Sequence, residues 1–242
     1  MLAWSPPVTS LPMIGRPTGA DTIPAVARPR WSTVLFDLDG TLVDTIGLIV
    51  ASHRHAVTTV LGRDLPDDVL RSGIGRPLID QMRVFDPDHA DELLATYRTW
   101  NHANTERLLA KYPGVDELLV ALDAAGVQIG VVTSKARDAV DLAFRILPPP
   151  VRYRALVTHE DTTSHKPGPE PLLHALQLLG AGPADAVYVG DARYDVEAAR
   201  AAGTASVAVA WGAGDRASLE AAAPDAIADT PQELAVLLGV EM

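Results

Sequence analysis

The sequence of 242 residues is long enough to bury one large core, or a core with a small inserted domain, and its 48% hydrophobic and 21% charged residues are typical of a soluble globular protein. A formal net charge of −11 argues against non-specific binding to nucleic acid or to an anionic membrane. The absence of cysteine excludes disulfides, zinc–thiolate sites and a thiol nucleophile, and it is consistent with a cytoplasmic protein. No apolar run approaches about 18 residues, so no membrane-spanning helix is expected.

Residues 1–30 contain repeated prolines with scattered glycine, threonine and arginine, and they show no sustained hydrophobic periodicity. They also lack the basic start, apolar centre and small-residue cleavage site of a secretory signal. We expect a poorly ordered N-terminal tail, or a chain whose translation start has been assigned too far upstream.

The most informative stretch begins with a short apolar run, Thr33–Phe36, which is typical of a buried strand and ends abruptly in acid. Asp37 and Asp39 lie two residues apart, so on extended backbone their side chains leave the strand on the same side. Two carboxylates about 4 Å apart repel by roughly 4 kcal/mol at an effective dielectric constant of about 20. The pair therefore indicates a shared cation or proton, although an isolated Asp-x-Asp is as often an ordinary turn. Gly40 permits a tight turn, and a helix is expected to begin at Leu42.

Residues 46–112 have a helical pattern. The segment Ile46–Leu61 is amphipathic in places, and a second stripe of apolar residues at helical spacing precedes a proline and a glycine. Between the two lies a glycine-rich break, Ser72–Pro77, which is too irregular for a helix interior. We expect an all-helical domain inserted between two parts of another domain, residues 31–45 and 113–242.

After this insertion, apolar runs of strand length alternate with helical patterns. The expected strands are Val127–Thr133, Ala155–Thr158, Ala186–Gly190 and Ser206–Ala210. The expected helices are Val115–Ala125, Ala136–Ile146, Pro171–Leu179, Val196–Ala202 and Pro231–Leu238. Such alternation predicts a parallel sheet covered by helices on both faces. Ligands of such sheets bind beyond the carboxyl ends of the strands, so functional side chains are expected there.

Polar side chains do follow these strands. Thr133 and Ser134 end one of them, and a helix beginning near Ala136 would direct the positive end of its dipole toward an anion bound there. The same two residues could equally serve as an ordinary helix cap. Lys166 lies in a proline-rich loop that leaves it few conformations just before another helix. A lone lysine in a loop is otherwise usually exposed to solvent.

Two further acidic residues follow another strand. Asp191 comes directly after Gly190, and Asp195 lies four residues later, on the same helix face if the helix starts at once. The glycine lets the backbone approach a bound ion closely. Taken alone, Gly-Asp is a common turn.

The stretch Asp37–Asp44 resembles the first motif of haloacid dehalogenase-like (HAD) hydrolases, most of which are magnesium-dependent phosphatases. Thr133, Lys166 and the pair Asp191 and Asp195 resemble the second, third and fourth motifs of that family, in the family order. The resemblance runs from just before the first strand to the last helix. It implies an α/β fold, with a HAD-like Rossmannoid core whose parallel sheet is covered by helices on both faces, and it identifies the helical insertion as a cap of type 1.

The resemblance also implies roles for these residues. Asp37 would be the nucleophile that becomes an aspartyl-phosphate, and Asp39 the general acid and base. Thr133, with Ser134 beside it, and Lys166 would hold the transferring phosphoryl group. The Mg²⁺ ligands implied by the resemblance are Asp37, the backbone carbonyl of Asp39, Asp191 and, in a supporting position, Asp195.

Within the family, Tyr97–His102 and Val132–Asp138 resemble the branch of the pyrophosphatase PpaX and the phosphoglycolate phosphatases. Polar residues of the first segment could equally be surface residues of a cap helix. We expect a small phosphorylated metabolite or pyrophosphate as substrate, with Arg76 of the glycine-rich break binding a second anionic group.

A metal-independent haloacid dehalogenase and a non-catalytic HAD-fold regulatory module are the alternatives to this function. No nucleic-acid or membrane partner is expected, and the oligomeric state stays open.

Overall fold

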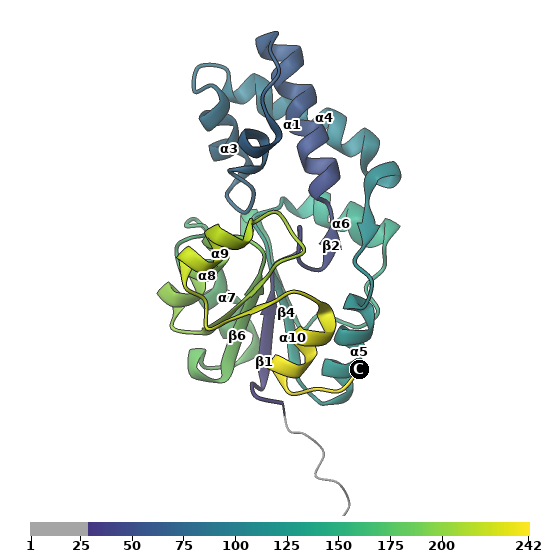
Figure 1. Ribbon diagram of the computed structural model, residues 1–242, viewed down its shortest axis with the longest axis vertical. Coiled ribbons are helices and arrows are strands. Elements are labelled where there is room, and N and C mark those ends of the chain that lie inside the picture. The colour runs from purple at the N-terminus through teal and green to yellow at the C-terminus, as the bar shows by residue number, and fades with distance from the viewer. Residues whose placement is uncertain (1–28) are drawn as a thin grey trace, which may run out of the picture.

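The computed structural model describes residues 29–242, which form a core with an inserted helical lobe (Figure 1). The expected N-terminal tail falls on residues 1–30, of which 1–28 lie outside the described residues. Arg30 is held against the core, because its backbone N–H donates to the Leu238 carbonyl at 3.0 Å.

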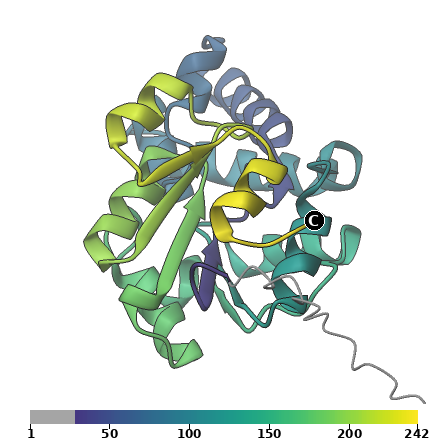
Figure 2. The same ribbon diagram turned by 60° about the horizontal axis from the view of Figure 1, so that its bottom comes forward.

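A six-stranded parallel sheet forms the centre of the core, in the order β5-β4-β1-β6-β7-β8. Its strands are β1 (Thr33–Phe36), β4 (Gln128–Val132), β5 (Ala155–Val157), β6 (Ala186–Gly190), β7 (Ala205–Val209) and β8 (Ala226–Ala228). All neighbouring strands run in the same direction, which the turned view of Figure 2 shows for β6 and β7. Phe36, the last residue of β1, is in register with Val131 and Val189 on the two adjacent strands. The carboxyl ends of the three central strands therefore meet at one edge.

Helices cover both faces of this sheet. They are α5 (Val115–Ala124), α6 (Arg137–Ile146), α7 (Glu170–Leu179), α8 (Arg193–Ala202), α9 (Arg216–Ala222) and α10 (Pro231–Leu238), with short 3₁₀ turns η1 (His159–Asp161) and η2 (Pro183–Asp185). Val34 and Phe36 pack toward α5 and α10, whereas Leu35 packs toward α7 and α8. Because every residue of β1 is buried, the strand is apolar on both faces and the sequence shows a continuous hydrophobic run rather than an alternation.

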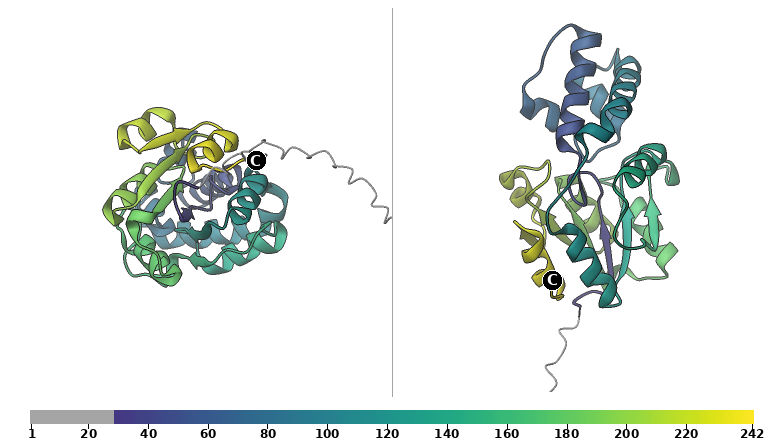
Figure 3. Two further views of the ribbon diagram at one scale, coloured as in Figure 1. Left: turned by 90° about the horizontal axis from the view of Figure 1, so that it is seen from below. Right: turned by 90° about the vertical axis from the view of Figure 1, so that its right-hand side faces the viewer.

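The inserted lobe, called the cap below, consists of α1 (Ile46–Leu61), α2 (Asp67–Arg71), α3 (Leu78–Phe85) and α4 (Ala90–Leu108). It has its own apolar core, which includes Leu70, Met82 and Leu93. A narrow waist joins it to the core domain (Figure 3). In this waist β2 (Val43–Asp44) pairs antiparallel with β3 (Ala110–Lys111), so the two chain crossings lie side by side.

Most predicted strands and helices agree with the structure to within a few residues, but the helix predicted from Leu42 is wrong. The N–H groups of Leu42 and Val43 both donate to the Leu38 carbonyl at 3.0 Å, which closes a turn, and Val43 then pairs with the strand that returns from the cap. The helix begins at Ile46 instead. Strand β8 and helix α9 were not predicted. No helix within residues 29–242 is long and apolar enough to cross a membrane.

Candidate active site

Three side chains singled out by the sequence lie at the carboxyl ends of adjacent strands. Asp37 follows β1, Thr133 follows β4 and Asp191 follows β6. The backbone of Asp37 stays in the sheet, since its N–H donates to the Val189 carbonyl at 2.8 Å. The three residues are at most 4% exposed.

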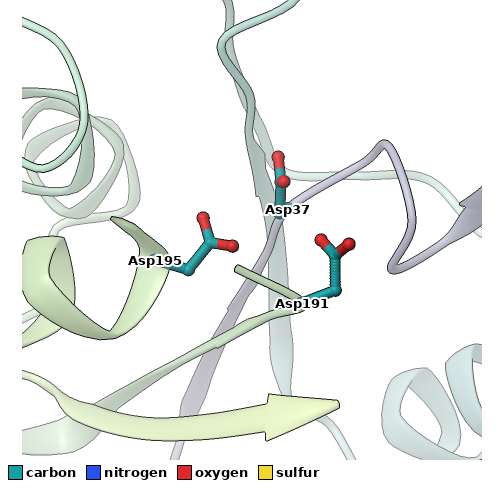
Figure 4. Close-up of side chains that lie close together, drawn as sticks. All are labelled: Asp37, Asp191 and Asp195. Atoms are coloured by element: carbon teal, nitrogen blue, oxygen red, sulfur yellow. The ribbon is translucent and has the colours of Figure 1, made fainter. Parts of the chain in front are cut away.

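The carboxyl groups of Asp37, Asp191 and Asp195 face a common space, with one oxygen from each within 4.8 Å of the others (Figure 4). Burial is the main cause that raises the pKa of Asp37 to about 7; Lys166 opposes this rise, and the nearby carboxylates of Asp195 and Asp39 add to it. Burial, together with Asp195 and Asp37, also raises the pKa of Asp191 well above its usual value. The cluster is therefore short of positive charge.

Lys166 supplies the cation that this cluster contains. Its Nζ lies 2.7 Å from Asp195 Oδ1, 3.1 Å from Asp37 Oδ1 and 3.0 Å from the Tyr188 hydroxyl. Burial disfavours the ammonium charge, but Asp195 and Asp37 outweigh it and raise the pKa of Lys166. The Tyr188 hydroxyl donates in turn to the Val132 carbonyl at 2.8 Å. Lys166 is thus held by partners on two sides.

Asp195 has a different environment from the other two carboxylates. Its Oδ2 accepts the Ala192 N–H at 2.9 Å at the start of α8, and its Oδ1 accepts Lys166. Gly190 is required beside it, because a Cβ at that position would lie 2.4 Å from Asp195 Cβ. Both oxygens of Asp195 therefore have partners, and the residue orients Lys166 and the helix start.

Asp191 is fixed by contacts from the turn after β1 and from the loop after β7. Its Oδ1 accepts the Thr41 hydroxyl at 3.2 Å, and its Oδ2 accepts the Ala213 N–H at 2.6 Å. Gly40 makes the approach possible, because it has φ +80° and a Cβ there would lie 2.2 Å from Asp191 Oδ2. The Trp211 indole N–H donates to the Thr41 carbonyl at 3.1 Å and supports the same turn.

Comparison with known proteins identifies the group to which this arrangement belongs. Residues 34–209 match the family model of the haloacid dehalogenase-like hydrolases. The chain belongs to this HAD family. It is 38% identical over 207 residues to a pyrophosphatase PpaX from Bacillus cereus, covering 86% of this chain and 96% of the relative.

Two solved structures have the same fold. A predicted phosphatase from Clostridium acetobutylicum superimposes with a TM-score of 0.76 at 26% identity, covering 84% of this chain and 96% of the other. A predicted phosphoglycolate phosphatase from Haemophilus somnus superimposes with a TM-score of 0.79 at 23% identity, covering 86% and 97%. The second likeness concerns the fold alone. The chain is a HAD hydrolase with a helical cap.

The buried carboxylates of this HAD hydrolase could hold a divalent metal ion. Lys166 Nζ lies 3.1 Å from Asp37 Oδ1, and among residues 29–242 no other group pairs with this buried oxygen. Three carboxylates face one ammonium, and carboxylate oxygens are the ligands that small hard cations prefer. The side chain of Asp39 is not part of this cluster and pairs elsewhere.

A cavity of about 150 Å³ opens between the HAD core and the cap. Asp37, Asp39 and Thr133 line it from the core. Arg76, Arg98 and His102 are among the residues that line it from the cap. The structure thus brings Arg76 to the same cavity as Asp37, Asp39 and Thr133, whereas Lys166, Asp191 and Asp195 are not among the residues that line it.

Ser134 contacts the cap rather than the carboxylate cluster. Its hydroxyl donates to the Gly75 carbonyl at 2.9 Å, across the boundary between core and cap. The neighbouring Thr133 hydroxyl accepts the Lys135 N–H at 3.2 Å. Ser134 as a substrate ligand stays a prediction.

Sequence reasoning missed several residues that hold this site. Lys135 pairs with Asp39, Thr41 donates to Asp191, and the Tyr188 hydroxyl accepts from Lys166. Only Lys135 had a usable signal, since it lies two residues after Thr133 at a strand end. Tyr188 reads as one more apolar residue of a buried strand.

Proposed function

We propose that the protein is a magnesium-dependent phosphohydrolase that acts on a small phosphorylated anion through an aspartyl-phosphate intermediate. The observation that carries this proposal is Asp37, a buried carboxylate at a strand end whose Oδ1 faces the Lys166 ammonium at 3.1 Å and, within residues 29–242, no other partner. The similarity to pyrophosphatase PpaX over most of both chains supports pyrophosphate as substrate. Phosphoglycolate is the second candidate, because the same cavity suits a phosphate with a nearby carboxylate.

In the first step an oxygen of Asp37 attacks phosphorus. The bond from phosphorus to the leaving oxygen breaks, and its electron pair goes to that oxygen, which takes a proton from Asp39. The products are an aspartyl-phosphate and the protonated leaving group.

In the second step a water molecule attacks the same phosphorus and gives a proton to the Asp39 carboxylate. The bond to Asp37 breaks, its carboxylate is restored, and inorganic phosphate leaves. Each turnover thus consumes one water and returns both aspartates to their starting states.

Lys166 and Thr133 are suited to hold the transferring group between these steps. The Lys166 ammonium lies beside the nucleophile, where it neutralises phosphoryl oxygens, and the buried Thr133 hydroxyl follows the adjacent strand. Mg²⁺, when bound by Asp37, Asp191 and the Asp39 carbonyl, supplies charge neutralisation for the phosphoryl group. Asp195 does not contact the phosphoryl group in this proposal; it holds the Lys166 ammonium beside Asp37.

The assignment of the nucleophile is tested by Asp37→Asn, because an amide does not attack phosphorus. We expect essentially complete loss of phosphate release from pyrophosphate, phosphoglycolate and p-nitrophenyl phosphate, with an unchanged circular dichroism spectrum. Asp123→Asn, on the exposed side of α5, is the matched control and should behave as the wild type. A folded Asp37→Asn protein with undiminished activity would falsify the mechanism.

The metal is tested separately. Chelation should abolish activity and Mg²⁺ should restore it, whereas Ca²⁺ should restore it poorly, because its larger and looser shell can take both oxygens of Asp37. Full phosphate release in chelator would contradict the metal site. Inactivity toward every phosphate substrate would favour one of the two alternatives, a metal-independent dehalogenase or a non-catalytic module. The cytoplasmic location expected from the cysteine-free sequence stays a prediction.

A further inference from the structure

Lys135 is a partly buried cation that the mechanism above does not use. Its Nζ lies 2.9 and 3.1 Å from the two carboxylate oxygens of Asp39, and the side chains are 13% and 16% exposed. The Lys135 backbone is fixed at both ends, since its N–H donates to Thr133 Oγ1 at 3.2 Å and its carbonyl accepts the His159 N–H at 3.1 Å. The ammonium is therefore held in place beside Asp39.

The surroundings of this ion pair determine what it can bind. Lys135 and Asp39 both line the cavity between core and cap. Across the cavity lie Arg76 and Arg98, neither of which forms an ion pair within residues 29–242. Lys135 is therefore the cation on the core side, beside the carboxylates of Asp37, Asp39 and Asp138, whereas the cap side of the lining carries Arg76 and Arg98 and, within residues 29–242, no carboxylate.

We infer that Lys135 binds a second anionic group on the leaving-group side of the substrate, exchanging its ion pair with Asp39 for that group. The inference rests on the proposed function, in which Asp39 protonates the leaving oxygen. To reach that oxygen, Asp39 must turn away from Lys135. A leaving group with its own negative charge gives Lys135 a replacement partner, whereas a neutral one leaves a partly buried ammonium unpaired.

This exchange defines a substrate class. The substrate carries an anion within a few bonds of the scissile oxygen, as the second phosphate of pyrophosphate and the carboxylate of phosphoglycolate do. Lys135 keeps its protons throughout; the proton on the leaving oxygen comes from Asp39 and the electron pair from the broken bond to phosphorus. The residue thus selects the substrate without joining the proton transfer.

The test compares two substrates of nearly equal size, 2-phosphoglycolate and 2-hydroxyethyl phosphate, which differ by a carboxylate against a neutral hydroxymethyl group. The measured quantity is the ratio of their kcat/KM values, with Mg²⁺ present. The wild type should favour phosphoglycolate. Lys135→Met should lower this ratio roughly 10-fold or more, as expected for the loss of a charge-assisted contact. Lys135→Arg, which keeps the charge, should retain most of the preference.

Arg216→Met is the control for a general loss of positive charge, because Arg216 pairs with Glu220 and Asp229 on the surface of the core and does not line the cavity. It should leave the ratio unchanged. If Lys135→Met does not fold, as judged by its melting curve, Lys135→Gln replaces it.

Equal losses of kcat/KM on both substrates in Lys135→Met would overturn the inference, because Lys135 would then only position Asp39. A wild-type enzyme that hydrolyses both substrates equally well would overturn it without any variant. A wild type inactive on these substrates, on pyrophosphate and on p-nitrophenyl phosphate would refute the proposed function and this inference together. The three failures are therefore distinguishable.

Discussion

At the scale of single residues, Arg76 is the cap residue best placed to contact the substrate. It lines the cavity, and its guanidinium carbon lies 5.8 Å from the centre of the Tyr194 ring, on the core side of the boundary. No carboxylate within residues 29–242 pairs with it. A planar cation with free donors suits a phosphate or carboxylate, so Arg76 would complement Lys135 from the opposite wall.

Arg76→Ala should therefore lower kcat/KM for pyrophosphate or phosphoglycolate by roughly 10-fold or more, since it removes a charge-assisted contact to the second anion. The loss on p-nitrophenyl phosphate, whose leaving group is uncharged in the ester, should be much smaller. Arg83→Ala is the matched control on the same part of the cap, because Arg83 is exposed and pairs with Asp80. Equal losses on both kinds of substrate would remove Arg76 from the specificity site.

The site residues that could be predicted are those that stand in a recognisable local sequence pattern. Asp37, Lys166 and Asp191 each follow a strand or lie in a stiff loop, and knowledge of sheet geometry is enough to bring them together. The contacts of Lys135 with Asp39 and of Thr41 with Asp191 span 96 and 150 residues, and their partners depend on side-chain direction. No local pattern encodes that direction.

At the scale of elements, the glycine-rich break between α2 and α3, residues 72–77, contacts the core directly. Gly75 has φ +99°, and a Cβ there would lie 2.9 Å from Ala192 Cβ and 3.3 Å from Tyr194 Cδ2. Its carbonyl accepts the Ser134 hydroxyl. The break thus meets both the loop after β4 and the loop after β6, and it brings Arg76 with it.

Gly75→Ala should impair this contact in two ways, through strain at a left-handed backbone angle and through collision with the core. We expect kcat/KM to fall by roughly 10-fold or more, about 1.4 kcal/mol or greater. Gly62→Ala separates the two effects, because Gly62 also has a positive φ of +64° but has open space around its missing Cβ. Comparable activity losses in the two variants would indicate strain alone and would contradict the docking role.

Elements with a sustained hydrophobic pattern were predicted well, whereas elements that depend on contacts with distant segments were not. The long helical patterns of cap and core, such as Ile46–Leu61, gave the right type and nearly the right ends. The helix predicted from Leu42 failed because the N–H groups of this stretch close a turn on Leu38 and Val43 pairs with Lys111, a residue contributed by a distant segment. Strand β8, with three residues at the sheet edge, is too short to show periodicity.

At the scale of the whole molecule, the cap and the core have separate apolar interiors, and the cap interior contains a histidine. His53 is 0% exposed, its Nδ1 contacts the Leu70 carbonyl at 2.8 Å, and its Nε2 has no partner within residues 29–242. Phe85 and Tyr97 pack against its ring with centroids at 5.1 Å. Burial lowers the pKa of His53 from 6.5 to about 4, so the folded cap holds the neutral ring.

This shift makes the stability of the protein depend on pH with a known sign. Below pH 6.5 the unfolded chain binds a proton at His53 and the folded chain does not, so the free energy of unfolding falls as the pH drops from about 6.5 to about 4. The slope approaches about 1.4 kcal/mol per pH unit and the total about 3 kcal/mol. Above pH 7 the contribution is complete and constant.

The measurement compares urea unfolding of the wild type and of His53→Gln, which cannot titrate, between pH 7.5 and about 4.5 with Mg²⁺ present. The difference in free energy between the two proteins isolates His53, because it cancels the contribution of groups such as Asp37, whose pKa is raised. We expect the wild type to lose its relative stability as the pH falls. A difference that stays constant over this range would show that the folded and unfolded chains take up the proton at the same pH, so that folding does not lower the pKa of His53.

The waist between the lobes has a consequence for how such a chain can diversify. Because Val43–Asp44 and Ala110–Lys111 lie side by side, the two points at which the cap is spliced into the core are adjacent in space. A segment of almost any length can span such a gap without displacing the strands on either side. The residues proposed to make and break the bond to phosphorus lie in the core, whereas Arg76 and Arg98 lie in the insert. Exchanging one insert for another therefore alters what the enzyme selects while leaving in place how it reacts.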